Sequence, residues 1–172
     1  MKPNVGRGDK GETDFRGKRV NKSSCNIEAV GNIDELNSFI GFIRTVNREK
    51  DIDSILSRIQ NDLFALGADI ATGSDRITKE SVKFIEDSIN KLEEELEPLS
   101  KFILPGGTQS AALLHIARAI CRRAERGVVA FAKNEKLNEY TIPYLNRLSD
   151  LLFTLARVAN KRAGVEEEEW KS

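Results

Sequence analysis

Three arginines recur at one-turn intervals on a stretch that is predicted to be helical. Arg118, Arg122 and Arg126 stand at positions i, i+4 and i+8, with Glu125 beside them. Exposed like charges at this spacing repel by roughly 0.2–0.5 kcal/mol per pair, so the stripe destabilises an isolated helix. Two interpretations remain open from the residues alone. Either the stripe is a solvated face with Glu125 as its internal partner, or it receives an anion or a carboxylate from elsewhere.

Short polar side chains interrupt two otherwise apolar helical stretches. Asn146 and Asp150 stand one turn apart, and asparagine is a poor helix former, so its presence indicates a local hydrogen bond or a recognition group. The neighbouring Arg147 and the more distant Arg123 are expected to point to other faces. A similar polar set lies near the start of the first helical stretch and comprises Asp34, Glu35, Asn37 and Ser38.

The N-terminal stretch GRGDKGET, residues 6–13, is too rich in glycine and charge to pack a core. Its Arg7-Gly8-Asp9 triplet is an adhesion motif, but the sequence shows no signal-peptide core and no disulfide framework that would favour an extracellular ligand. A frayed terminus is the simpler interpretation. Because the stretch lacks apolar anchors, we expect residues up to about 20 to be mobile until a ligand orders them.

A second glycine-rich site, Gly106-Gly107-Thr108, opens a predicted helix. Free N–H groups at a helix start can hold an anion. The site is not a P-loop, since no Lys-Ser/Thr pair follows at the required spacing and no strand precedes it. An ordinary helix start after a tight loop is therefore the favoured interpretation.

The single histidine, His115, excludes several kinds of catalytic site. A ferritin-like di-iron bundle needs Glu-x-x-His on two helices, and Ala112 stands three residues before His115. A zinc site or a Ser-His-Asp triad is equally unsupported. We expect His115 to be a satisfied packing residue on an apolar helix. An enzyme with this sequence would work by positioning and electrostatics, without an obvious general base.

Apolar residues recur at spacings of three and four in five stretches, which predicts five helices. The first helix spans residues 27–48, and the second is capped by Asp51 and ends at the break at 72–74. The third is capped by Thr78 and ends at Pro98. The fourth starts near Thr108, and the fifth starts between 138 and 143 and ends by Gly164. The apolar stripe of the fourth is Leu113, Ile116, Ile120 and Ala124. No stretch alternates with period two over a useful length. The predicted fold is all-α, an antiparallel up-down bundle of four long helices plus a fifth, with short loops.

Length and charge place these helices in one domain. The 172 residues suffice for one buried core, and we divide them into a flexible glycine-rich segment (1–26), the bundle (27–165) and an acidic tail (166–172). Lys plus Arg and Asp plus Glu number 27 each, which argues against nucleic-acid binding through bulk positive charge. No apolar run approaches the roughly 20 residues of a membrane span. Cys25 and Cys121 lie far apart without metal-ligand spacing, which favours a reduced, cytoplasmic setting.

Four segments in this order resemble the ATP:corrinoid adenosyltransferases of the propanediol-utilisation type. The segments are GDKGET (8–13), VGNIDELNSFIG (30–41), FILPGGT (102–108) with CRRAER (121–126), and YLNRLSDLLFTLAR (144–157). The resemblance spans about residues 6 to 163, and the four segments together are highly specific. It implies a homotrimer of helical bundles with active sites between subunits. It also implies transfer of the 5′-deoxyadenosyl group of ATP to the cobalt of cob(I)alamin, which forms adenosylcobalamin and releases triphosphate.

The resemblance gives the N-terminal segment a role, because in this family it wraps the triphosphate and becomes ordered when nucleotide binds. Glycines let main-chain N–H groups approach phosphates closely, and lysines add charge. The matching residues are Gly8, Asp9, Lys10, Gly11, Thr13 and, downstream, Lys22. The family's usual Thr-Arg/Lys-Thr triplet is replaced here by Val5-Gly6-Arg7, so its hydroxyl contacts are lost and Arg7 is the candidate that compensates.

The resemblance also assigns the arginine stripe. It implies that Arg122, Glu125 and Arg126 line the nucleotide site, with Arg126 facing phosphate and Asn146 helping to hold the nucleotide. Asp34 matches an aspartate that pairs with the arginine at Arg122 across the subunit interface. The predicted catalytic set is Arg122, Arg126 and Asp34.

The implied chemistry explains the missing base, because cob(I)alamin is already a strong nucleophile. The protein needs only to align C5′ with cobalt and to stabilise triphosphate, with Mg²⁺ held mainly through the ATP phosphates. The family also removes the lower axial ligand of the corrinoid in an apolar pocket, for which Phe102 and Phe153 are candidates. A flavoprotein reductase and an adenosylcobalamin-dependent enzyme are the implied partners.

Two other functions remain open at this stage. An ATP-binding regulatory protein on the same bundle would keep the N-terminal segment and lack corrinoid turnover. A structural helical oligomer would bind neither ligand, and its glycine-rich N-terminus would be a disordered tail.

Overall fold

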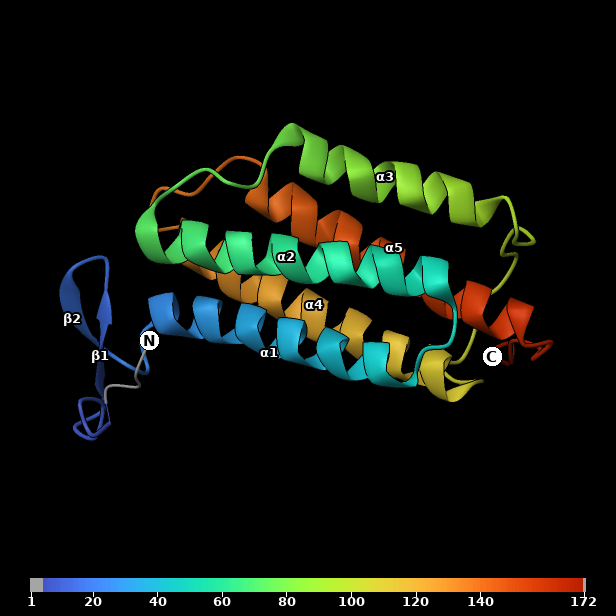
Figure 1. Cartoon of the computed structure of the whole chain (residues 1–172), viewed down its shortest axis with the longest axis horizontal. Helices are drawn as coiled ribbons and strands as arrows, with labels where there is room; N and C mark the ends of the chain where they lie inside the picture. Colours follow the sequence, from blue (N-terminus) through green and yellow to red (C-terminus); the bar gives the residue numbers. More distant parts are fainter. Residues whose placement is uncertain (1–4, 172) are drawn as a thin grey trace.

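The computed structural model describes residues 5–171 and shows a helical bundle with a small hairpin at one end (Figure 1). Its elements are β1 (Glu12–Phe15), β2 (Lys18–Asn21), α1 (Cys25–Val46), α2 (Lys50–Thr72), α3 (Lys79–Glu93), α4 (Gln109–Ala132) and α5 (Thr141–Arg162). The predicted all-α bundle is confirmed. The prediction of no strand is wrong, because the two antiparallel strands are each four residues long, too short to show an alternating pattern.

The predicted helix limits agree with the structure except at two places. Thr78 and Thr108 are N-caps as predicted. Asp51 is not a cap: Glu49 holds that position, and the Asp51 carboxylate accepts hydrogen bonds from Arg162 at the end of α5. The third helix ends at residue 93, well before Pro98, so the connection to α4 is longer than the predicted short loops.

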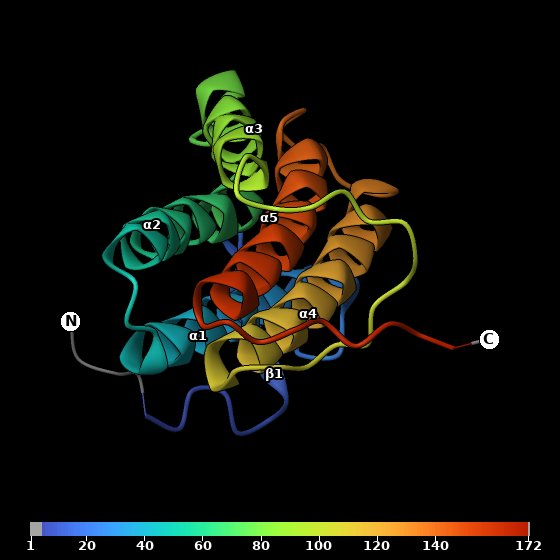
Figure 2. The ribbon, with the colours of Figure 1, turned by 90° about the vertical axis from the view of Figure 1, so that its right-hand side faces the viewer.

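The helices lie side by side in the order α2, α1, α4, α5, α3 around one core (Figure 2). The predicted stripes of α1, α2 and α5 are largely buried. On α4 the stripe is displaced, because Ile116 is 48% exposed while Ala117 and Cys121 are fully buried. Small side chains let α4 lie close to its neighbours, and a search for large apolar residues misses them. Within residues 5–171, no helix carries an apolar stretch long enough to cross a membrane.

The hairpin has the apolar anchor that the sequence seemed to lack. Phe15 is only 6% exposed and meets the ring of Phe131, near the end of α4, edge to face at 6.2 Å. Arg16 and Gly17 form the turn, with φ of 48° and 75°. Two successive residues with positive φ suit the twist of a tight hairpin. The expectation of a segment without apolar anchors is therefore wrong.

The acidic tail also lies against the bundle. Two backbone hydrogen bonds of 2.8 Å each join residues 102–104 to residues 168–170. An ion pair of 3.0 Å joins Arg157 of α5 to Glu167. Residues 165–171 thus form a strap over the long connection that precedes α4.

Candidate active site

The arginine stripe of α4 carries charge that the chain does not neutralise. Arg122 and Arg126 are exposed, and one Nη of Arg126 donates to the Arg122 carbonyl at 3.0 Å. Within residues 5–171, the only ion pair made by α4 joins Arg123 to Glu35 of α1. Two neighbouring guanidinium groups without a carboxylate are arranged to receive an anion.

Glu125 does not compensate the stripe, because it belongs to a different hydrogen-bond chain. Its Oε1 accepts from Nδ2 of Asn146 at 3.4 Å. Oδ1 of Asn146 accepts from Arg147 at 2.7 Å, and Arg147 pairs with Glu86 of α3 at 3.2 Å. The structure therefore brings Glu125 and Asn146 together as predicted. Arg147, which was expected to point to another face, instead fixes the orientation of the Asn146 amide.

The glycine-rich turn before β1 holds a lysine against its backbone. The Gly11 N–H donates to the Gly8 carbonyl at 3.1 Å, and the Lys22 N–H donates to the Gly11 carbonyl at 2.8 Å. A Cβ on Gly8 would lie 2.7 Å from Nζ of Lys22, so a side chain at this position would displace the ammonium group. Asp9 and Lys10 are exposed at the tip of the turn. The turn thus presents cationic and backbone N–H groups together, as a phosphate site requires.

Arg7 lies beside this turn but is engaged within the chain. Its guanidinium pairs with Asp14 at 3.0 Å, and its carbonyl accepts from Arg19 at 3.0 Å. The pair with Asp14 uses one Nη of the guanidinium, and the Arg7 side chain is 60% exposed. Compensation by Arg7 for the missing hydroxyl contacts to phosphate stays a prediction.

Arg122 and Arg126 lie in the half of α4 that ends near the hairpin, whereas Arg118 lies in the other half. Phe15 packs on Phe131, which follows Arg126 by five residues, or roughly 7.5 Å along the helix axis. The N-termini of α1 and α5 lie at this end too (Figure 1). The predicted nucleotide residues, although spread from residue 7 to residue 146, thus lie in the half of the molecule that carries the hairpin.

An apolar cavity of about 520 Å³ separates the hairpin from α1 and α2. Thr13, Asp34 and Asn37 supply polar groups to a lining that is otherwise largely apolar. Asn37 is 7% exposed, and its Oδ1 has no hydrogen-bond partner within residues 5–171. A buried acceptor without a donor is costly, so this oxygen marks where a ligand group could bind. The sequence placed Asn37 in the polar set of the first helix but gave it no role.

Asp34 and Arg122 do not meet within one chain. Asp34 is exposed at the rim of the cavity, while Arg122 lies on α4. Their neighbours Glu35 and Arg123 make the ion pair that links α1 to α4. The predicted pairing of Asp34 with Arg122 across two subunits stays a prediction.

The second glycine-rich loop is a helix cap, as the favoured interpretation held. Oδ1 of Asn160 accepts from the Thr108 N–H at 2.9 Å, and its Nδ2 donates to the Gly106 carbonyl at 3.0 Å. The Thr108 hydroxyl accepts from the Ala111 N–H at 3.1 Å. Gly107 has φ of 100° and lies directly against the Asn160 amide. Two of the N–H groups that an anion would need are already used.

His115 is a packing residue, but it is not hydrogen-bonded as predicted. It is 4% exposed, lies 5.8 Å from the Phe153 ring, and neither ring nitrogen has a partner within residues 5–171. Burial, followed by the charge of Arg118, lowers its pKa. An imidazole that is so enclosed is not placed to act as a general base on a bound nucleotide. Phe153 is held by His115 and, at 6.0 Å, by the guanidinium of Arg118.

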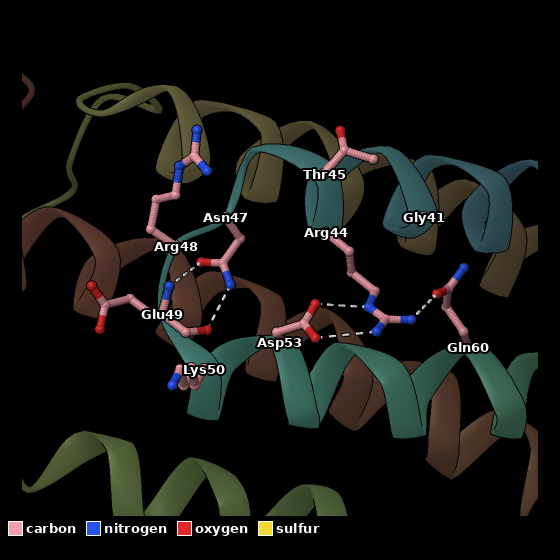
Figure 3. A pocket seen from close by; sticks show the side chains of 9 residues that line it. All are labelled: Gly41, Arg44, Thr45, Asn47, Arg48, Glu49, Lys50, Asp53 and Gln60. Atoms are coloured by element: carbon pink, nitrogen blue, oxygen red, sulfur yellow. Dashed lines mark hydrogen bonds and ion pairs between the residues drawn. The ribbon is translucent and has the colours of Figure 1, made fainter.

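A cavity of about 600 Å³ at the opposite end of the bundle contains none of the predicted site residues (Figure 3). There Arg44 donates to both carboxylate oxygens of Asp53 at 2.8 and 3.1 Å, and to Gln60 at 2.9 Å. The Arg44 hydrogen bond is the main cause that lowers the pKa of Asp53. Among the residues that line this cavity, Arg44, Asp53 and Gln60 already satisfy one another.

Comparison with known proteins identifies the family. The cobalamin adenosyltransferase family model matches residues 4–159. A corrinoid adenosyltransferase of Bacillus subtilis is 46% identical, covering 99% of this chain and 93% of its own. A cobalamin adenosyltransferase of Cupriavidus metallidurans is 44% identical, with 95% and 91% covered. A variant PduO-type ATP:corrinoid adenosyltransferase from Lactobacillus reuteri, complexed with cobalamin and ATP, superposes with a TM-score of 0.93 at 33% identity, covering 98% of each chain. The chain belongs to the cobalamin adenosyltransferase family.

Proposed function

We propose that the end of the bundle that carries the hairpin binds ATP, and that the chain transfers its 5′-deoxyadenosyl group to the cobalt of cob(I)alamin. The observation that carries this proposal is the uncompensated charge of Arg122 and Arg126 beside a hairpin that presents Lys22 over Gly8. Relatives and a solved structure of the family, the latter with cobalamin and ATP bound, support the same substrates.

The triphosphate is assigned to the glycine-rich turn and the stripe. Gly8, Gly11 and Lys22 would surround the phosphates, Arg126 would contact them with its planar fork, and Asn146 would hold the nucleotide through its oriented amide. Within residues 5–171, no group of three His, Cys, Asp or Glu side chains is placed to hold a metal ion. We therefore infer that Mg²⁺ arrives with ATP, held by the phosphates, and supplies charge neutralisation on the leaving group.

The reaction needs alignment and stabilisation of charge. The Co(I) electron pair attacks C5′, the bond from C5′ to oxygen breaks, and that electron pair leaves with triphosphate while cobalt becomes formally Co(III). No proton transfer is required, which agrees with a site in which the one histidine is buried and neutral. Arg122 and Arg126 would stabilise the departing triphosphate electrostatically.

The apolar cavity beside the hairpin is our candidate for the corrinoid side of the site. Thr13 from the ATP segment and Asp34 from α1 both line it, so an occupant there would lie next to the nucleotide. Corrinoids carry amide side chains, and the buried Oδ1 of Asn37 is an acceptor for one of them. Of the two phenylalanines considered for removing the lower axial ligand, Phe153 is partly buried and packs against His115, whereas Phe102 is 81% exposed. Phe102 is therefore the better candidate, provided that a neighbouring chain brings it to the cavity.

We propose a homotrimer with sites between subunits. Asp34 and Arg122 could pair only if a neighbouring subunit supplied one of them. In addition, three large apolar side chains are exposed: Phe102 by 81%, Ile116 by 48% and Leu104 by 42%. Exposed apolar side chains of this size are typical of interfaces. Cys25 and Cys121 are both free thiols, which fits a reduced cytoplasmic setting. There a flavoprotein reductase would supply the reduced corrinoid, and an adenosylcobalamin-dependent enzyme would use the product.

The deciding experiment mixes the purified chain with MgATP and chemically reduced cob(I)alamin under anaerobic conditions. We expect the absorption spectrum of cob(I)alamin to change to that of adenosylcobalamin, with triphosphate released in equal amount. Binding of ATP without turnover would contradict the proposal and favour a regulatory protein. Light scattering at micromolar concentration should give a trimer, and a monomer would contradict the shared site.

A further inference from the structure

The turn of the hairpin contains a residue that the turn itself does not favour. Arg16 has φ of 48° and Gly17 has φ of 75°. Glycine and asparagine adopt this left-handed conformation readily, whereas other residues lose roughly 1 kcal/mol or more there. An arginine in this place is therefore explained by its side chain and not by its backbone.

The Arg16 side chain clamps the hairpin to the bundle. Its Nε and one Nη both donate to the Ile70 carbonyl in the last turn of α2, at 3.1 and 2.9 Å. Its other Nη pairs with Glu135, beyond the end of α4, at 3.1 Å. The guanidinium lies 5.5 Å from the Phe15 ring and 5.4 Å from the Phe131 ring. A cation at a helix C-terminus that also meets two aromatic rings is well stabilised.

The clamp acts on the glycine-rich turn through a short, regular ladder. β1 and β2 pair from Phe15 with Lys18 at the turn to Glu12 with Asn21 at the other end. The Gly8–Gly11 turn follows directly, closed by the hydrogen bond from Lys22 to Gly11. Arg16 therefore fixes one end of a rigid hairpin whose other end carries the proposed phosphate site.

We propose that Arg16 is a positioning residue for ATP: it holds the hairpin on the bundle before nucleotide arrives, without touching the nucleotide itself. The proposal rests on the proposed function, because it assigns the Gly8–Gly11 turn to ATP. Where only a fraction of the free protein is competent to bind, the apparent dissociation constant rises in inverse proportion to that fraction. Loss of the clamp should therefore weaken ATP binding. The hairpin also lines the candidate corrinoid cavity, but bound ATP would hold it in place, so corrinoid binding and the chemical step should be unaffected at saturating ATP.

The sharpest variant is Arg16→Gly, because glycine suits the turn and removes only the side-chain contacts. We expect the KM for ATP to rise roughly tenfold, as it would if the hairpin were docked a tenth of the time. We expect kcat and the KM for cob(I)alamin, both measured at saturating ATP, to stay unchanged. Without nucleotide, amide hydrogen exchange of residues 8–13 should become faster than in the wild type. Arg16→Lys, which keeps the charge and loses the fork, should recover part of the ATP affinity.

Arg76 provides a matched control, since it also lies near the end of α2 but contacts Asp69 and not the hairpin. Arg76→Met should leave the KM for ATP unchanged. Glu135→Gln removes one contact of the clamp and should raise this KM by less than Arg16→Gly does. A wild-type KM for ATP and wild-type exchange in Arg16→Gly would overturn the proposal, while adenosyl transfer by the wild type would leave the proposed function standing. An equal rise in the KM for cob(I)alamin would also overturn it.

Discussion

The two ends of the bundle use arginine in opposite ways. At the end where α1 meets α2, Arg44 pairs with one carboxylate of the same chain and Arg162 pairs with three. At the other end, Arg122 and Arg126 stand on one face of α4 and take part in no ion pair within residues 5–171. In the first arrangement the arginine charges are compensated within the chain, which serves stability. In the second they are compensated only when a ligand or a neighbouring subunit adds negative charge, which is typical of a functional site.

Arg162 shows how complete the first arrangement is. It donates to Asp51 at 2.8 and 2.9 Å and to Glu95 at 2.7 and 2.9 Å, and it joins α5 to the start of α2 and to the segment after α3. These hydrogen bonds are the main cause that lowers the pKa of both carboxyl groups and raises that of Arg162. The chain itself thus supplies the carboxylates that compensate the charge of Arg162.

The largest effect should follow from Arg126→Ala. The variant loses a charge-assisted contact to phosphate that is typically worth about 1.5–3 kcal/mol, or roughly ten- to a hundredfold in binding or rate. Because Arg126 is exposed, the substitution opens no core cavity, and we expect helicity and melting temperature to stay unchanged. Steady-state kinetics measure the activity, and circular dichroism measures the helicity and the melting temperature. Wild-type turnover would mean that the stripe is a solvated face.

Arg126→Lys sharpens this test, because an ammonium group keeps the charge but cannot reproduce the planar fork. We expect Arg126→Lys to keep only part of the activity.

Asn146→Ala should strongly reduce adenosyl transfer as well, since it removes the amide that Arg147 and Glu125 orient. Arg123→Ala is the control on the same helix as Arg126: it breaks a surface ion pair with Glu35 and should leave ATP binding intact.

The next effect should follow from Asp34→Ala, which tests whether the free charge on α4 is met by a neighbouring chain. If Asp34 pairs with Arg122 across subunits, activity should fall by roughly tenfold, the scale of one charge-assisted contact. The trimer should dissociate at higher protein concentration than the wild type does. Light scattering over a dilution series measures this change. Unchanged assembly and activity would show that Asp34 serves only its own chain.

The sequence predicted the bundle well because each helix carries its own apolar period. The family resemblance, and not the helical spacing, brought Glu125 and Asn146 to the same site, and their side chains do meet. The sequence missed features that depend on contacts between distant segments: Arg16 on Ile70, Asn160 on Thr108, and the strap over residues 102–104. A buried asparagine and an arginine in a tight turn carry no periodic signal. The hairpin strands were missed because four residues contain too little alternation.

A smaller effect is expected at the end where α1 meets α2. Arg162→Gln should lower the free energy of unfolding by about 1 kcal/mol, the upper range for partly exposed pairs, because it breaks three ion pairs at once. The KM for ATP and kcat should not change. Urea denaturation and steady-state kinetics measure the two quantities. A loss of activity without a loss of stability would reverse the assignment of the two ends.

The smallest effect is a dependence on acid. Arg162 holds the pKa values of Asp51 and Glu95 below the values of about 3.9 and 4.3 that these groups have in unfolded chains. A carboxyl group with a lowered pKa in the folded state contributes stability above its unfolded pKa, and this contribution is lost as the pH falls through the folded pKa. The wild type should therefore be more stable than Arg162→Gln at pH 7, and the difference should shrink towards pH 3. Since the Asp51 side chain is 51% exposed, we expect a change of only a few tenths of a kcal/mol, measured by urea denaturation at both pH values.

Arg122→Gln is the comparison from the other end. It breaks no ion pair within the chain, so its stability relative to the wild type should not follow this pH dependence. A difference between wild type and Arg162→Gln that is constant from pH 7 to pH 3 would show that Arg162 stabilises the bundle by packing and not through its carboxylates.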